Sequence, residues 1–269
     1  MENKVFFIFS DIHGRKLERL NRVLIKAGFD ENNENHILVS LGDLFDRGHH
    51  NLDLLRFVNH YLKKDRAIVL WGNHELMLKT LYNKELSVGI KINKFDGLNT
   101  TLAEFIKANN PDVKEEALLD FENTCLVNEE IKTLIMNLRN FDELDFYMTN
   151  LLPYKDLNGY LLSHTGVTEC LDYEKYDRMQ LTIELFSVLL AQRQSNNLFT
   201  GHSFVKYPPR FDKHGRTKVI HGHTHVNAYS DSNINVFIDK NHICLDSEHS
   251  INVLKMIGER IEVFQELYE

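Results

Sequence analysis

The sequence has little of what marks several large classes of protein. Only 4 of its 269 residues are Pro and 13 are Gly, which excludes collagen-like and linker-like tracts. No apolar run approaches the roughly 18 residues that a membrane helix needs, so we expect no membrane partner. The three cysteines, Cys125, Cys170 and Cys244, include no C-x-x-C pair, which argues against a zinc ribbon and suits a reducing compartment. The apolar run Val5–Phe9 is short and no cleavage site follows it, so it predicts a strand and not a signal peptide. We therefore expect a cytoplasmic location.

The charge balance is acidic. The chain has 31 Lys and Arg against 39 Asp and Glu, a net charge of −8, so its surface offers little general attraction for nucleic acid. A nucleic-acid partner is therefore not expected, and a nuclease is disfavoured without being excluded. Apolar residues make up 43% of the chain, which is enough to fill a core. The sequence does not indicate an oligomeric state.

Short apolar runs rich in β-branched and aromatic residues predict strands. The run after the first predicted strand has the apolar spacing of a helix from Leu17 to Gly28, and a second helix follows Asn51, which we predict as its N-cap. Near the end of the chain, Gly258 predicts a hairpin. This order predicts a layered α/β fold whose functional groups gather at the carboxyl ends of the strands. The predicted strands are Val5–Phe9, Ile37–Leu41, Ala67–Trp71, Tyr160–Leu162 and Lys218–Ile220.

A long segment interrupts this alternation. Residues 79–150 carry apolar stripes at helical spacing, Thr101 and Glu104 match a capping box, and Pro111 is a helix-start signal. We predict a helical insertion over about 79–150. Because no repeat, linker or low-complexity tract appears, we expect one domain over residues 1–269.

Residues able to bind a metal follow each predicted strand. Such a repeated coincidence predicts one shared site above the sheet, since the carboxyl ends of parallel strands meet there. Carboxylate, imidazole and amide ligands together suit borderline ions such as Mn, Fe or Zn rather than calcium or structural zinc. The ligands exceed what one ion requires, which favours two ions bridged by a carboxylate from the central strand, Asp43. The candidates are Asp11, His13, Asp43, Asn73, His74, His164, His221, His223 and His225.

These residues stand in five ordered motifs: Ser10–Gly14 (SDIHG), Gly42–Gly48 (GDLFDRG), Gly72–Glu75 (GNHE), Ser163–Gly166 (SHTG) and Gly222–His225 (GHTH). Together they resemble the calcineurin-like metallophosphoesterases, and the second and third motifs resemble the phosphoprotein phosphatase branch, with its bacterial and phage-type members and the related symmetrical diadenosine tetraphosphatases. The resemblance runs from Phe9 to about Asp246. It implies the layered metallophosphoesterase fold, with central β-sheets flanked by helices.

The resemblance also implies a ligand set for two divalent metal ions, with Mn²⁺ the expected ion and Fe or Zn as alternatives. It leaves open whether His225 joins the first ion, because many phosphoprotein phosphatases have Pro at that place. Asp43 would bridge the two ions. The first ion would be held by Asp11, His13 and Asp43, and the second by Asp43, Asn73, His164 and His223.

Catalytic roles follow from the same resemblance. In this superfamily a metal-bridging hydroxide attacks phosphorus in line. His74 would be the general acid that protonates the leaving oxygen, and Asp46 would orient it and favour its charged form. Arg47 would bind phosphate oxygens through its planar guanidinium.

The family usually supplies a second phosphate-binding arginine after the fourth motif. We predict Arg193, with Arg178 and Arg210 as alternatives. On this resemblance the expected activity is hydrolysis of phosphomonoesters on phosphoserine or phosphothreonine proteins. The alternative partner is a small phosphorylated substrate, in a symmetrical dinucleoside tetraphosphate hydrolase. A nuclease-type phosphodiesterase and an inactive scaffold rank below both.

Overall fold

The fold is built on two five-stranded sheets. The computed structural model describes residues 4–83, 87–92, 96–165, 218–223, 225–226, 235–238 and 242–268. In the first sheet the order is β10-β9-β1-β2-β3, with β1 (Val5–Phe9), β2 (His36–Ser40), β3 (Ala67–Val69), β9 (Ser250–Ile257) and β10 (Arg260–Leu267). In the second the order is β4-β5-β6-β8-β7, with β4 (Lys155–Leu157), β5 (Tyr160–Leu162), β6 (Lys218–His221), β7 (Phe237–Ile238) and β8 (His242–Cys244).

Parallel strands form the centre of each sheet. β1 pairs in parallel with β2 and β2 with β3, whereas β5, β6 and β8 are the parallel strands of the second sheet. The predicted hairpin is present: β9 and β10 are antiparallel, and Ile257 pairs with Arg260 across Gly258. All the strands predicted from the sequence are observed. β2 begins and ends one residue earlier than predicted, β3 ends at Val69 rather than Trp71, and β6 extends to His221.

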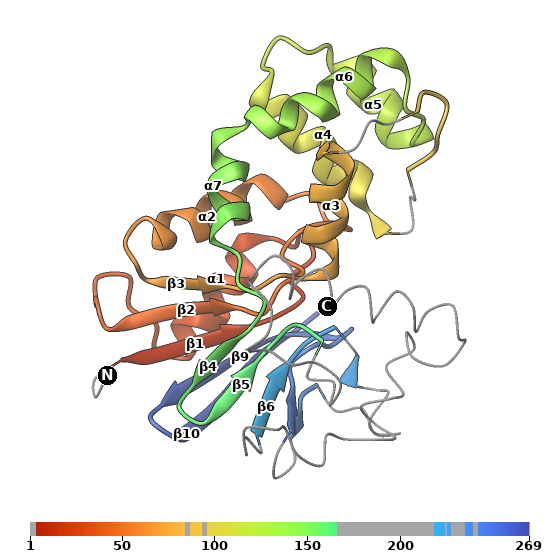
Figure 1. Ribbon diagram of the computed structural model, residues 1–269. Coiled ribbons are helices and arrows are strands. Elements are labelled where there is room, and N and C mark those ends of the chain that lie inside the picture. Colours follow the sequence, from red (N-terminus) through yellow and green to blue (C-terminus); the bar gives the residue numbers. More distant parts are fainter. Residues whose placement is uncertain are drawn as a thin grey trace, which may run out of the picture.

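The side chains of β1 show how the layers are stacked, because alternate residues of a strand point to opposite faces. Phe7 and Phe9 belong to a core cluster that also contains the buried residues of the helices. Phe6 and Ile8 belong to a second cluster, together with residues of the second sheet such as Leu162. One face of the first sheet is therefore covered by helices, and the other packs on the second sheet (Figure 1).

All the helices of the described chain come between β1 and β4 in the sequence, and in space they lie on one side of the two sheets (Figure 1). Each buries an apolar face; in α1 it consists of Leu20, Val23 and Leu24. No helix among the described residues is long and apolar enough to cross a membrane. The chain has the mixed α/β fold class that the sequence predicts. The helices are α1 (Leu17–Lys26), α2 (Asn51–Leu62), α3 (Asn73–Asn83), α4 (Leu98–Asn109), α5 (Glu115–Thr124), α6 (Glu129–Asn137), a 3-10 turn Leu138–Asn140, and α7 (Asp142–Asn150).

The helical segment begins differently from the prediction. Lys79, the expected start of the insertion, lies inside α3, because Leu78 and Tyr82 continue the buried face of a helix that begins at Asn73. Helices α4–α7 account for most of the rest of residues 79–150. Their buried residues share one core cluster with those of α1, α2 and β1. The single domain over residues 1–269 stays a prediction.

Three local predictions about helix ends are wrong. Pro111 follows the end of α4 and α5 starts only at Glu115, while Thr101 lies inside α4, whose N-cap is Gly97. Asn51 is the first residue of α2 and does not cap it; its side chain instead accepts from the Asp46 N–H at 2.8 Å.

Glu104 explains why the capping box is absent. It reaches across to the start of α2, where its carboxylate accepts from the Asn51 side chain at 2.7 Å and from the Leu52 N–H at 2.9 Å. Glu104, which in the sequence resembles part of a helix cap, therefore connects α4 to the start of α2. Long-range contacts have replaced local ones.

Candidate metal centre

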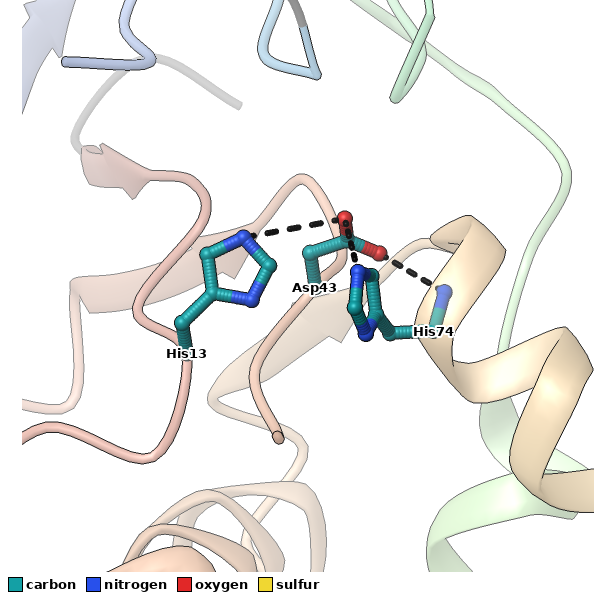
Figure 2. Close-up of side chains that lie close together, drawn as sticks. All are labelled: His13, Asp43 and His74. Carbon is teal, nitrogen blue, oxygen red and sulfur yellow. Dashed lines mark hydrogen bonds and ion pairs between the residues drawn. The ribbon is translucent and has the colours of Figure 1, made fainter. Parts of the chain in front are cut away.

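The predicted ligands converge around Asp43, in the loop after β2. Its Oδ2 atom lies 3.3 Å from His164 Nε2 and 3.9 Å from the Nε2 atoms of both His13 and His74. Figure 2 shows Asp43 between the rings of His13 and His74. Among the described residues, two groups have ligand atoms close enough to share an ion: His13, Asp43 and His74, and Asp43, His164 and His223. Asp43 is common to both.

Asn73 and Asp11 extend these two groups. Asn73 Oδ1 lies 3.0 Å from His164 Nε2 and 2.8 Å from His223 Nδ1, so the amide oxygen faces the second group. Asp11 Oδ1 lies 3.8 Å from His13 Nε2, and its Oδ2 accepts from the His223 N–H at 3.0 Å. Loops after β1, β2, β3, β5 and β6 thus meet at the carboxyl ends of their strands, as the sequence predicts.

The loops that carry these side chains have unusual backbone conformations. The described chain contains nine non-glycine residues with positive φ, and six of them lie in this site. Left-handed conformations cost L-residues free energy and concentrate where the surrounding structure holds a functional group in place. The turns therefore point side chains into the centre at the expense of backbone energy. The six are Asp11, His13, Asp43, Asp46, Arg47 and His223.

Glu75 holds two of these loops together. It is fully buried, and its carboxylate accepts from the backbone N–H groups of Asp43 (2.9 Å), Leu44 (2.9 Å) and Gly72 (3.1 Å). Tyr147, on α7, donates its hydroxyl to the same carboxylate at 3.3 Å. Glu75 lies in the third motif, and the sequence alone indicates no role for it. It fixes the relative positions of the loops after β2 and β3.

His74 and Asp46 form the buried pair that the sequence predicts. His74 Nδ1 lies 2.6 Å from Asp46 Oδ2. Thr101 holds Asp46 in turn, because its hydroxyl donates to Oδ1 and accepts from the Asp46 N–H. Burial disfavours a charged imidazole, but the carboxylates of Asp43 and Asp46 outweigh it and raise the pKa of His74 to about 9.

Two of the candidate ligands are held neutral. Burial lowers the pKa of His13 to about 3 and that of His223 to about 4. His13 Nδ1 donates to the Phe45 carbonyl oxygen at 3.2 Å, which leaves the lone pair on Nε2, the atom that faces Asp43. A backbone carbonyl on the remote nitrogen is the usual way to orient a metal-binding imidazole.

The buried carboxylates of the site repel one another and favour nearby positive charge. Burial and the nearby Asp246 raise the pKa of Asp11 to about 7. Burial opposes a charge on His164, but Asp43 raises its pKa to about 10, so His164 holds a proton at neutral pH. Bound cations would neutralise these carboxylates and displace that proton. Oxygen and imidazole donors without a thiolate fit borderline divalent metals, so the residues present suit a metal centre.

Arg47 and His225 lie at the edge of this cluster. Arg47 is exposed, and its positive charge adds to the effect of burial that lowers the pKa of His13. His225 is outside both ligand groups: its Nδ1 lies 3.3 Å from Asp246 Oδ1 and its Nε2 lies 3.4 Å from Glu248 Oε1. Arg193, Arg178 and Arg210 lie outside the described residues.

Asp246 is a buried carboxylate that the sequence analysis used only to mark the end of the resemblance. It follows β8 and lies beside the centre, where burial would raise its pKa but His225 lowers it. A signal was available in the sequence. The apolar run Ile243–Leu245 precedes Asp246, which is the pattern of a strand followed by a ligand residue seen at the other five strands.

Comparison with known proteins agrees with this geometry. Residues 4–227 match the family described as calcineurin-like phosphoesterase, which is most of the chain. The chain therefore belongs to this family of metal-dependent phosphoesterases. Among solved structures, a cold-active protein-tyrosine phosphatase from a psychrophilic Shewanella has a TM-score of 0.55 at 17% identity, covering 99% of this chain and 80% of that one. This likeness concerns the fold.

Curated relatives carry names of a narrower kind. An asymmetrical bis(5'-nucleosyl)-tetraphosphatase, PrpE of Oceanobacillus iheyensis, is 23% identical over 225 residues, covering 81% of this chain and 76% of that protein. A symmetrical bis(5'-nucleosyl)-tetraphosphatase of Colwellia psychrerythraea is 30% identical over 163 residues, covering 60% and 47%. Three of the curated relatives are matched over less than half of their length.

Proposed function

We propose that this protein hydrolyses dinucleoside tetraphosphates at a two-metal centre. The observation that carries the phosphoesterase chemistry is the position of Asp43, shared by two groups of ligand atoms and facing the buried His74–Asp46 pair. The substrate class is supported by the curated relatives, which are named bis(5'-nucleosyl)-tetraphosphatases. Both the ligand set and the substrate are proposals about this chain.

The proposed ligand set keeps the residues predicted from the sequence. One ion would be held by Asp11, His13 and Asp43 and the other by Asp43, Asn73, His164 and His223. Metal ions at such a centre supply Lewis-acid stabilisation of the phosphoryl oxygens and an activated water. The mixed oxygen and imidazole donors suit Mn²⁺, Fe and Zn alike. We propose Mn²⁺ on the resemblance to the family, and reconstitution with each ion in turn would test that choice.

The chain's own residues would manage the leaving group and the phosphate charge. His74 Nδ1 bonds to Asp46, which leaves Nε2 as the atom that would release a proton to the oxygen of the departing nucleotide. Asp46 keeps the ring oriented and favours its charged form. Arg47, exposed beside the centre, would bind phosphoryl oxygens with its planar guanidinium. The roles of His225 as a metal ligand and of Arg193 as a phosphate ligand remain predictions.

A direct test compares substrates on one preparation. Purified protein, stripped and reloaded with Mn²⁺, would be offered diadenosine tetraphosphate, phosphoserine and phosphothreonine peptides, and single-stranded DNA. We expect the highest kcat/KM for diadenosine tetraphosphate, with two ADP marking symmetrical cleavage and ATP with AMP marking asymmetrical cleavage. Orthophosphate from the peptides at a higher kcat/KM would reject this substrate and support the phosphoprotein activity that the sequence resemblance favours.

A further inference from the structure

A cationic pocket of about 330 Å³ lies beside the metal centre. Its charged and aromatic lining consists of Arg15, Lys16, Arg19, His49, His50 and Tyr268. The backbone of Gly14 and Gly48, from the loops after β1 and β2, completes the wall. Among the described residues, no acidic side chain lines it. The chain as a whole has a net charge of −8, so this pocket is a local concentration of basic side chains on an acidic protein.

Of the basic side chains in this lining, His50 lies 3.6 Å from a carboxylate, that of Asp53, whereas the three on the segment Arg15–Arg19 have no such close partner among the described residues. Within the described part of the chain, no ion pair with a carboxylate involves Arg15, Lys16 or Arg19. Arg22, one turn further along α1 than Arg19, instead pairs with Glu266. Guanidinium and ammonium groups without a close carboxylate partner, gathered around one concave surface, attract polyanions such as phosphate chains.

Tyr268 keeps two of the guanidinium groups in place. The Arg15 guanidinium carbon lies 4.2 Å from the centre of the Tyr268 ring, and that of Arg19 lies 5.8 Å from it. Tyr268 is anchored by its own N–H, which donates to the His249 carbonyl at 2.6 Å. Guanidinium groups held over an aromatic ring lose less side-chain entropy when they bind an anion.

The pocket is built on the loops that carry the first group of ligands. Arg15 Nη1 donates to the Asp11 carbonyl oxygen at 3.1 Å, and the Gly48 N–H donates to the His13 carbonyl oxygen at 3.0 Å. Besides burial, the carboxylates of Asp246 and Asp11 contribute to a pKa of about 12 for Tyr268. A ligand that reaches from the metal centre along this loop would therefore meet Arg15, Lys16 and Arg19.

We propose that this pocket binds the phosphate groups of the substrate that lie beyond the bond being broken. The inference rests on the proposed function, because only a substrate with several linked phosphates would extend that far. The metal centre and Arg47 neutralise the phosphoryl group under attack, whereas the remaining phosphates of the chain need cations of their own. The pocket supplies these cations without placing a further group on the reacting phosphorus.

Two basic side chains can be tested without disturbing the ligand loop. In Arg19→Gln, and in the double variant Lys16→Gln with Arg19→Gln, the bond from Arg15 to Asp11 is retained. We expect the ratio of kcat/KM for diadenosine tetraphosphate to that for para-nitrophenyl phosphate to fall about tenfold in Arg19→Gln, which corresponds to about 1.4 kcal/mol. The fall should come from KM, and the double variant should lose more. Arg22→Gln makes the same charge change outside the pocket, so its ratio should equal that of the wild type.

A binding measurement separates this inference from the proposed function. Inorganic tripolyphosphate would be titrated calorimetrically into the metal-free protein at fixed ionic strength. We expect about tenfold weaker binding to Arg19→Gln than to the wild type or Arg22→Gln. If the wild type does not cleave diadenosine tetraphosphate but the variants show this difference in binding, the proposed function is wrong while phosphate binding by the pocket is supported. Equal affinities for all variants, or no binding of tripolyphosphate to the wild type, would contradict the proposal that the pocket binds phosphate groups.

Discussion

The two sheets support their shares of the metal centre in different ways. The first sheet contributes Asp11, His13, Asp43 and Asn73, and the loop after β2 is held by side chains of the helical segment, through Tyr147 on Glu75 and Thr101 on Asp46. The second sheet contributes His164 and His223. His164 is held by a backbone carbonyl, since its Nδ1 donates to Leu41 O at 3.0 Å. The helices therefore stabilise mainly the half of the site that carries the proposed general acid.

Asp43→Asn should have the largest effect, because Asp43 is the residue that both halves share. The amide removes one negative charge from each group of ligands, so we expect loss of both metals and a fall in kcat/KM of at least about 10³-fold. Metal content by mass spectrometry and steady-state kinetics would measure the two effects. Asp65→Asn is a matched control, because Asp65 also has a positive φ but is exposed and remote from the ligands. Full occupancy by two ions in Asp43→Asn would contradict the shared role.

His74→Asn should damage turnover without emptying the site. General acid catalysis typically contributes about 10²–10⁴-fold, so kcat should fall within that range while both metals stay bound. The loss should be smaller for a substrate with a more acidic leaving group, which needs less help from a proton donor. His60→Asn, at an exposed position of α2, should leave kcat unchanged. Loss of a metal ion from His74→Asn would instead make His74 a ligand.

Metal affinity should rise with pH, because ions must displace protons from ligands contributed by both sheets. His164, whose pKa is raised to about 10, is protonated at neutral pH and must release its proton to bind an ion. Affinity should increase about tenfold per pH unit for each proton released between pH 6 and 8. Asp11, with a pKa of about 7, adds a second proton at the lower end of this range. Titrations in two buffers of different ionisation enthalpy would count the protons, and a count of zero would refute this prediction.

Thr101→Val should have the smallest effect of these changes. Its effect should be limited to the part of the site that the first sheet contributes. It removes the hydroxyl that bonds to Asp46, and an unsatisfied buried partner typically costs about 1–3 kcal/mol. We expect kcat to fall about tenfold with both metals retained. Thr133→Val, on α6, removes a hydroxyl that bonds only within its own helix and serves as the control. If Thr101→Val also released a metal ion, the two halves would not be supported independently.

Local pattern was sufficient to predict most of the fold and the convergence of the proposed ligands at one edge of the sheets. The strands Val5–Phe9 and Tyr160–Leu162 are observed with the predicted bounds, because apolar runs and the residues that end them are local features. The ligands of the centre follow such runs, so their convergence could be expected from the geometry of parallel strands.

Contacts between distant residues could not be predicted in this way. Thr101 and Glu104 match a capping box in the sequence, yet their side chains bond to Asp46, in the loop after β2, and to Asn51, the first residue of α2. The spacing of residues in α4 does not indicate these partners, because the contacts depend on how the helix packs against the rest of the fold. Asp246 could have been found from the strand before it, but its proximity to Asp11 depends on the pairing of β6 with β8.

At several positions of the site, a left-handed backbone lowers the stability of the fold while the side chain there is needed for the proposed activity. Arg47, with φ of 65°, carries a long side chain where glycine would be more stable by up to about 1–2 kcal/mol. Selection for thermal stability alone would thus favour Arg47→Gly, although that change removes the proposed phosphate-binding guanidinium. A thermostable variant obtained without an activity screen would tend to be a well-folded protein with an impaired site. Stabilisation is better sought in the surface of α5 or α6, away from the strained turns.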